Sequence, residues 1–205
     1  MTVFQSESVS DIIARAFGWA EHKARFDSLE DGTIDARQAR IAYDARRRNV
    51  LESMDWNFAR RRYAPGGVLS NEPTPAEMPY AFSVPPGCLR VRKVRSGRHD
   101  LKWVREANIF ANAGDDVQVV YTSDETNPGL FAPSFVLCLE YLLAAQFAMV
   151  YARSVNRSNA MLKNYRDAMR EADTMEGFEQ SNDEAYARSA LDLALGSNDF
   201  AKPVS

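Results

Sequence analysis

The chain of 205 residues is long enough for one domain, or for one domain that carries an insertion. Its hydrophobic content of 45% and aromatic content of 11% suffice for a sizeable core and exclude a disordered chain. A formal net charge of −3 argues against a dedicated nucleic-acid binder, because such domains are usually basic.

The first third of the chain is predicted to form two helices. Ser8 or Ser10 can cap the first helix. The apolar face of this helix holds four residues, namely Ile12, Ile13, Ala16 and Phe17. The second helix begins at Thr33, carries apolar residues at three- and four-residue spacing, and is expected to end near Asp55.

The middle of the chain changes from a helical to an alternating pattern. Residues 64–86 hold most of the prolines and are predicted to be a loop. The following stretch "CLRVRKVR" alternates apolar and basic residues, "LKWVREANIF" is one strand or two short ones, and "VQVVYT" is the clearest strand. These segments predict a small antiparallel sheet inserted between helical parts.

The longest apolar stretch, residues 135–152, has about the length of a membrane helix. Glu140 and Gln146 lie in its interior, and a carboxylate is costly in lipid, so we expect a buried core helix and no membrane. A further amphipathic helix is predicted from about Asn159 to Glu176. Residues 181–205 are predicted to be an extended tail, with a short helix as an option within it.

No enzymatic motif stands out in the sequence. There is no dinucleotide-binding glycine pattern, no phosphate-binding loop, no zinc-protease motif and no nucleophile elbow. His22 and His99 are isolated histidines, and Cys88 and Cys138 are expected to be buried small hydrophobes. We therefore expect no catalytic site, no metal and no cofactor.

Two arginine triplets are the strongest polar signal. Arg46, Arg47 and Arg48 lie near the end of the second predicted helix, and Arg60, Arg61 and Arg62 follow two large aromatics in "DWNFARRRYAP". The last forty residues are acidic, and a chain with a basic middle and an acidic end can pair with its own copies. Solvated arginines with local ion pairs are the alternative. We take all six arginines as candidates for an interface with other subunits or partners.

The order of the motifs resembles a known family. "DWNFARRR", "PPGCLRV" and "VVYTSDETNPGLFAPSF", which runs into an alanine-rich helix, follow one another as in the head-to-tail adaptor proteins of tailed bacteriophages. The resemblance is to the tail tubular protein A type of short-tailed phages and covers roughly residues 9–180. It implies a helical bundle that carries a small β-rich insertion.

The resemblance also implies a structural virion protein and not an enzyme. Family members form a ring, typically of twelve subunits, that joins the portal protein to the tail nozzle or another tail protein. Genomic DNA passes through the central channel without specific recognition. The expected location is the neck of the virion, after assembly in the bacterial cytoplasm.

The expected fold class is therefore mainly α, a helical bundle with a small antiparallel β insertion and an extended C-terminal tail. Residues 1–63 and 126–180 are assigned to the bundle, 64–125 to the loop and β insertion, and 181–205 to the tail. The alternative function is a nucleic-acid-binding protein that uses the arginine triplets, with an affinity that falls steeply as salt rises.

Overall fold

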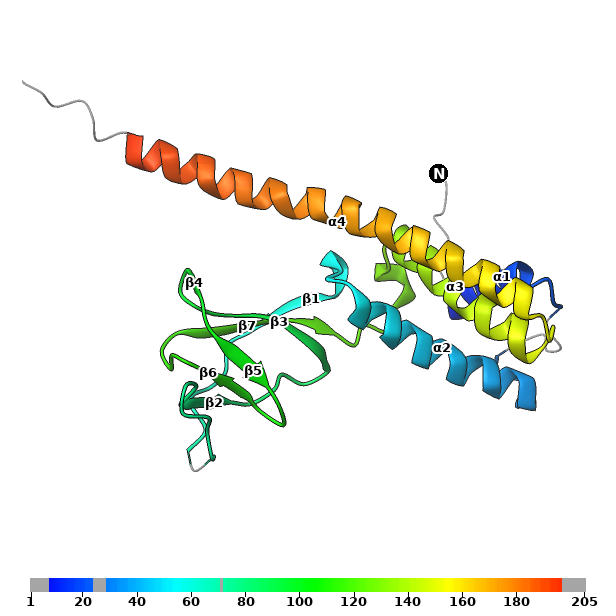
Figure 1. The fold of residues 1–205 in the computed structure, drawn as a ribbon, viewed down its shortest axis with the longest axis horizontal. Helices are drawn as coiled ribbons and strands as arrows, with labels where there is room; N and C mark the ends of the chain where they lie inside the picture. The colour runs from blue at the N-terminus through cyan, green and yellow to red at the C-terminus, as the bar shows by residue number, and fades with distance from the viewer. Residues whose placement is uncertain (1–7, 24–28, 71, 197–205) are drawn as a thin grey trace, which may run out of the picture.

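The computed structural model describes residues 8–23, 29–70 and 72–196, except for the side chains of 178–196. In that part it has four helices and two antiparallel sheets of seven strands in all, with 48% helix and 19% strand. The helices gather at one end of the molecule and the sheets at the other (Figure 1). Each end has its own hydrophobic core, and the molecule as a whole is elongated.

Capping residues and a proline set the starts of the helices. The Ser8 hydroxyl accepts a hydrogen bond from the first turn of one helix, and the Thr33 hydroxyl does so for the next. Pro133 occupies the first turn of the third, where its missing amide hydrogen is not needed. The helices are α1 (Val9–Trp19), α2 (Ile34–Ser53), α3 (Pro133–Val150) and α4 (Val155–Gly196).

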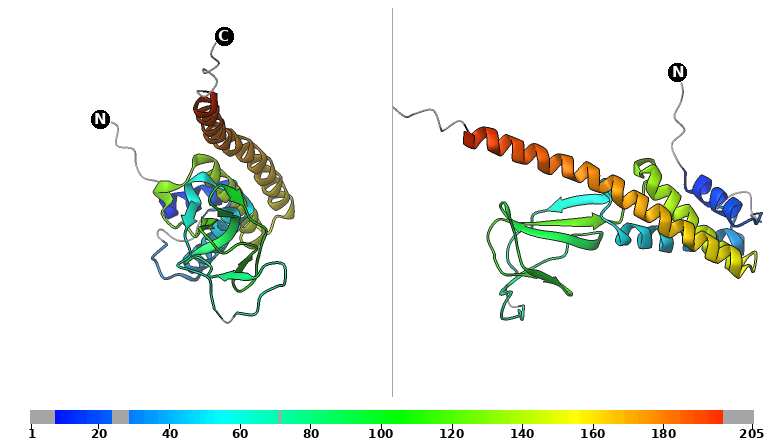
Figure 2. Two further views of the ribbon diagram at one scale, coloured as in Figure 1. Left: turned by 90° about the vertical axis from the view of Figure 1, so that its left-hand side faces the viewer. Right: turned by 45° about the horizontal axis from the view of Figure 1, so that its top comes forward.

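Helix α3 is the centre of the helical end. It is long and apolar enough to cross a membrane, but 56% of its residues are buried inside the protein. Helices α1, α2 and α4 pack around it, as the two further views show (Figure 2). The prediction of a buried core helix is confirmed.

Aromatic side chains close the helical core where α2 ends. Trp56 is fully buried, and its ring meets Phe135 of α3 edge-on at 5.1 Å between centroids. Phe58 lies at the same 5.1 Å from Phe135, and Phe131 at 4.8 Å. Edge-to-face pairs of this kind add to the burial of apolar area. Trp56 and Phe58 therefore close the helical core at this point.

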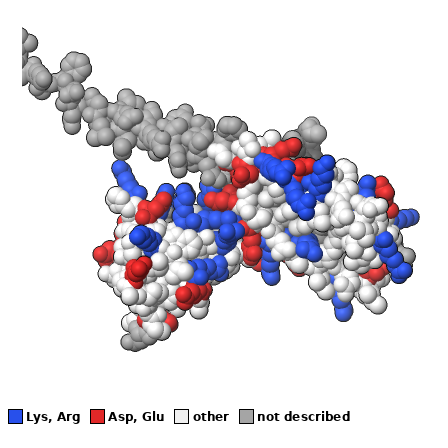
Figure 3. All heavy atoms as spheres, viewed as in Figure 1, with Lys and Arg blue, Asp and Glu red and all other residues white. Residues whose placement is uncertain are grey.

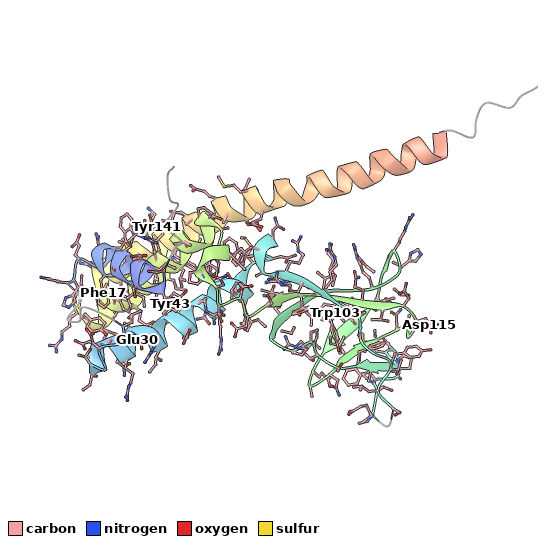
Figure 4. The ribbon with its side chains drawn as sticks, turned by 180° about the vertical axis from the view of Figure 1, so that it is seen from behind. Phe17, Glu30, Tyr43, Trp103, Asp115 and Tyr141 are labelled. Carbon is pink, nitrogen blue, oxygen red and sulfur yellow. The ribbon has the colours of Figure 1, made fainter. Side chains whose placement is uncertain are left out.

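The two sheets pack face to face around the second core. The strand orders are β1-β7-β3-β4 and β2-β6-β5, all antiparallel. The strands are β1 (Arg60–Tyr63), β2 (Tyr80–Phe82), β3 (Cys88–Ser96), β4 (His99–Asp100), β5 (Trp103–Arg105), β6 (Ile109–Ala111) and β7 (Val117–Ser123). Phe82, Ile109 and Val119 are among the side chains buried between the sheets. Figure 4 shows Phe17, Tyr43 and Tyr141 in the helical end and Trp103 and Asp115 in the sheet end.

The expected fold class, mainly α, is wrong, because the protein is a mixture of helices and sheets. β2 lies in the predicted proline-rich loop, and β1 directly follows the short 3-10 helix η1 (Asn57–Ala59). Each of these strands pairs with a partner distant in sequence, β2 with β6 and β1 with β7. β1 therefore belongs to the larger sheet, although its residues were assigned to the bundle.

The expected extended tail is wrong over residues 181–184, and the optional short helix, residues 185–195, is part of α4, which continues to Gly196. The predicted helix end at Glu176 rested on the polar composition of the residues that follow. Residues 177–195 contain no proline, and their single glycine, Gly177, costs only about 1 kcal/mol in a helix. Residues 197–205 of the predicted tail lie outside the described residues.

Candidate functional site

The first arginine triplet lies on α2, where it meets the segment after β7. Arg47 is buried, and its Nη1 donates to Asp124 Oδ1 at 2.6 Å and to the Glu125 carbonyl at 2.5 Å. Arg48 Nε donates to the other oxygen of Asp124 at 3.0 Å. Asp124 is thus held by two adjacent arginines, and Arg47 is engaged inside the protein.

Arg46, the third member of this triplet, points to a different element. Its Nε donates to Gln146 Oε1 on α3 at 2.8 Å. It lines a shallow hollow of about 270 Å³ together with Leu142 and Met149 of α3 and Leu162 of α4. The apolar lining indicates a packing surface and not a reactive centre.

The second triplet spans the start of β1. Arg60 makes two hydrogen bonds to the Asp55 carboxylate, at 3.2 and 3.0 Å, a forked geometry that suits a guanidinium. Arg61 donates to Glu125 Oε2 at 2.9 Å. Arg62 is exposed and has no ion pair or side-chain hydrogen bond within the part of the chain that is described.

Arg92 of β3 lies at the centre of the contact between the end of α2 and the larger sheet. It was not named as a candidate site residue in the sequence analysis. Its Nη2 donates to the carbonyls of Leu51 and Glu52 at 3.1 Å each and also to that of Met54. These carbonyls belong to the last turn of α2, where a cation satisfies groups that have no partner within the helix. Burial lowers the pKa of Arg92, the Asp55 carboxylate opposes this shift, and the positive charges of Arg90 and Arg60 add to it.

The arginine junction, made of Arg47, Arg60, Arg61 and Arg92 with Asp55, Asp124 and Glu125, therefore joins the helical end to the sheet end. Arg90 adds a hydrogen bond to the Glu52 carbonyl at 3.0 Å. The alternation of Arg90 and Arg92 in "CLRVRKVR" was the available signal, because alternating residues on a strand lie on one face. A register shift between Val91 and Lys93 brings Lys93 and Arg95 to the same face, and the sequence does not reveal it. These strand residues were not linked to the two arginine triplets in the sequence analysis.

The strand register gathers basic side chains on one face of the larger sheet. Across β7, Arg60 and Arg90 flank Thr122, and Arg62 and Lys93 flank Val120. Residues directly opposite each other share a face, so these side chains lie opposite the core between the sheets. Arg95 pairs with Gln118 on the same face, and Arg92 reaches Thr122 by a hydrogen bond of 2.7 Å. The basic face comprises Arg60, Arg62, Arg90, Arg92, Lys93 and Arg95.

Only part of this charge is neutralised within the chain. Asp55 pairs with Arg60, and Asp100 pairs with Arg95 at 2.6 Å. Arg62 and Lys93 are exposed and have no partner among the described residues. Figure 3 shows Lys and Arg side chains along the upper side of the sheet end, with Asp and Glu side chains among them. The basic face therefore keeps a surplus of positive charge.

A second contact holds α4 at the same place, where the helical end meets the sheet end. Glu176 of α4 is buried, and its carboxylate accepts a hydrogen bond from the backbone amide of Asn57 at 2.8 Å. Asn57 belongs to η1, which also holds Phe58 in the aromatic cluster. The helix is anchored here, and beyond Gly177 it extends away from the helical end along the side of the sheets (Figures 1 and 2).

Three further titratable side chains, Glu140, Cys138 and His22, have surroundings that indicate a structural role. Glu140 on α3 is buried and accepts from Arg15 Nε at 2.5 Å and from Trp19 Nε1 at 3.1 Å. Burial raises the pKa of the Cys138 thiol to about 12, and Glu171 adds to the shift. His22 stacks on Tyr151 at 5.6 Å between ring centroids. Within the described ranges, no group of three His, Cys, Asp or Glu side chains could hold a metal ion.

The chain matches no protein-family model and no curated protein. The resemblance to the phage adaptors therefore rests on the motif order alone.

Proposed function

We propose that the chain is a structural subunit, a head-to-tail adaptor of a tailed bacteriophage that forms a ring between portal and tail. The observation that carries the proposal is α4, a helix of 42 residues. Its last described side-chain contact with the body is at Glu176, and it continues to Gly196 away from the helical end. A helix that leaves its own core gains stability by packing on a partner, because most helical stability comes from tertiary contacts.

The distribution of charge supports an assembly role. A ring needs a heterologous interface, in which one surface of a subunit meets a different surface of the next. The basic face lies on the sheet end, while residues 178–196 of α4 contain four acidic residues and one basic residue. Such a chain offers two complementary surfaces, as a ring-forming subunit needs.

The ring would surround DNA without reading it. The protein is acidic overall, with a sequence pI near 5.5, and a channel that is not basic lets phosphates slide. The proposed partners are other copies of the chain, the portal protein, a tail protein and the passing genome. The proposed place is the neck of the virion.

Native mass spectrometry of the purified chain, mixed with the portal protein of the same genome, tests this function. We expect a closed oligomer of the chain on the portal, with twelve copies as in the adaptor family. Electron cryomicroscopy of the virion would place the ring below the portal. Absence of the chain from virions, together with no binding to any portal assembly, would refute the proposal.

Nucleic-acid binding through the triplets is the second candidate, and the basic face is the observation in its favour. Arg47, Arg60 and Arg61 are engaged with Asp124, Asp55 and Glu125, which weakens this candidate. It predicts an affinity for duplex DNA that falls steeply with salt. If the double variant Arg62→Ala, Lys93→Ala binds duplex DNA as tightly as the parent chain, this candidate is rejected.

A further inference from the structure

One part of the basic face packs on the end of α2, where Arg90 and Arg92 bond to backbone carbonyls, while the other part, at Arg62 and Lys93, is exposed. The opposite face contributes Val91, Val94 and Val119 to the core between the sheets. On the basic face, Val120 and Thr122 are buried under the stems of the flanking arginines and lysine. The charged ends of Arg62 and Lys93 are left at the surface.

The same chain carries a segment of opposite charge. Residues 178–196 form the part of α4 beyond the anchor and hold four acidic residues against Arg188 alone. In Figures 1 and 2 the larger sheet lies between α4 and the smaller sheet, so the basic face is turned toward the side on which α4 runs. The two surfaces are complementary in charge.

The helix does not lie down on the sheet of its own chain. α4 is one continuous helix from Val155 to Gly196, about 63 Å long at 1.5 Å per residue. Its anchor at Glu176 fixes its direction, and beyond that point it diverges from the sheet (Figures 1 and 2). Contact with its own basic face would require a break in the helix near Gly177. Contact with a second copy requires no such break.

A nucleic acid is a less suitable occupant of this face. Between the basic residues the face presents Gln118, Val120 and Thr122, and it offers no aromatic ring on which a base could stack. A phosphate backbone would also approach the side on which the acidic part of α4 runs. Its negative charge would be repelled there.

We propose that residues 178–196 of α4 of one copy dock on the basic face of the next copy. The contact is heterologous, so repeating it closes a ring or extends a filament. This inference rests on the proposed ring function and names the surfaces that form its subunit interface. Arg62 and Lys93 are the residues whose charges the acidic helix neutralises, because both lack a partner within the described part of their own chain.

Zero-length cross-linking tests the contact on the full chain. Carbodiimide joins a lysine amine to a carboxylate only where the two touch, so Lys93 reports on the basic face without assuming a helix register. Equal amounts of ¹⁴N- and ¹⁵N-labelled chain are mixed, cross-linked and digested. We expect mixed-isotope peptides that join Lys93 to acidic residues of 178–196, with their yield falling as salt rises from about 0.1 M to about 1 M.

Three variants make the result specific. Lys93→Arg keeps the charge and removes the reactive amine, so the cross-link is lost while the association remains. Arg62→Glu combined with Lys93→Glu weakens association by about tenfold, measured by sedimentation velocity. Lys102 is exposed on the sheet end outside the basic face and serves as the internal control. We expect no cross-link between Lys102 and a chain that carries the other isotope label.

The outcomes separate the interface from the function. Cross-linked peptides that join Lys93 to 178–196 but carry a single isotope label throughout would show that the helix covers its own sheet and would overturn the proposal. A ring on the portal, seen by native mass spectrometry, without the Lys93 cross-link would overturn it while leaving the ring function standing. Duplex DNA that binds and protects Lys93 from modification would identify a nucleic-acid site instead. With neither ring nor cross-link, both proposals fail.

Discussion

Arg47 is the arginine on which the arginine junction most depends. Its side chain is 2% exposed, and Asp124 is its carboxylate partner at 2.6 Å. Burying a charge is costly, and the cost becomes severe when the partner is removed and the charge is left behind. The triplet that looked like a surface for partners is, at this position, part of the interior.

Replacing Asp124 therefore destabilises the fold. We expect Asp124→Asn to lower the free energy of unfolding by about 3 kcal/mol, because Arg47 stays buried without a counter-charge. Urea denaturation followed by circular dichroism measures the change. The matched control is Asp100→Asn, since Asp100 pairs with Arg95 at the surface, and there we expect less than about 1 kcal/mol. Equal losses in the two variants would contradict the assigned role of Arg47.

The buried thiol of Cys138 gives a prediction about pH. Its pKa is raised by burial from 9.0 to about 12, so the thiol stays protonated in the folded protein at pH 8. We expect Cys138 to resist alkylation until the chain unfolds. Cys88, half-buried and with a pKa raised by burial despite Arg105 nearby, reacts slowly. Mass spectrometry after timed labelling checks both.

The same shift makes stability depend on pH. The unfolded thiol titrates near 9.0 and the folded one near 12, so its stabilising contribution is complete below pH 9 and is lost as pH rises toward 12. Burial also raises the pKa values of Tyr151 and Tyr165, which act in the same direction. Urea midpoints at pH 8 and pH 10 should differ less in Cys138→Ala than in the parent chain. An unchanged difference would refute this assignment.

Sequence patterns identified the residues that a helix periodicity or a cap can reveal. The apolar face of α1 is buried as predicted, at Ile12, Ile13, Ala16 and Phe17. The partners of the arginines were not accessible in the same way. Asp124 lies 77 positions from Arg47, and only the folded chain brings the two together. An arginine run in a sequence therefore does not show whether its members meet solvent, a partner or the interior.

At the scale of elements, the strongest predictions concerned segments with a regular period. β3 and β7 alternate clearly and were predicted, and α2 ends within two residues of the expected Asp55. β5 and β6 are the two short strands that were one of the two expectations for "LKWVREANIF". β1 and β2 are four residues long or shorter, and no period can be recognised over such a length. They are strands because β7 supplies the hydrogen-bond partners of β1, and β6 those of β2. That information is absent from the local sequence.

Gly177 is a weak point in α4, directly after the anchor at Glu176. It has nothing within 4 Å of an added Cβ, so alanine fits there without a clash. We expect Gly177→Ala to stabilise the helix by about 1 kcal/mol and to slow amide exchange in residues 178–196. Hydrogen–deuterium exchange with mass spectrometry measures this effect.

Gly18→Ala in α1 is the matched control for this substitution. Gly18 also has open space around an added Cβ, and it lies in a helix that packs on α3. We expect slower exchange in α1 and no change beyond residue 177. If Gly177→Ala leaves exchange in 178–196 unaltered, the helix there is already held by other contacts within its own chain.

At the scale of the whole molecule, ion pairs and hydrogen bonds connect the two hydrophobic cores at one place, where the helical end meets the sheet end. The arginine junction ties the end of α2 to the sheet, and Glu176 ties α4 to η1 at Asn57. Beyond this place α4 continues alone on the side of the sheets. The fold of both cores therefore does not require the last part of α4, whereas the proposed assembly does.

Removing residues 178–205 should separate folding from assembly. The body keeps the anchor at Glu176 and both cores, so we expect the shortened chain to fold and to unfold cooperatively in urea. It loses the acidic part of α4, so we expect it to form no ring on the portal in native mass spectrometry. Deletion of residues 197–205 alone is the control, because it leaves α4 intact to Gly196, and that variant should still assemble. Assembly of the shorter chain would show that the subunits join through other surfaces, such as the apolar hollow between α3 and α4 beside Arg46.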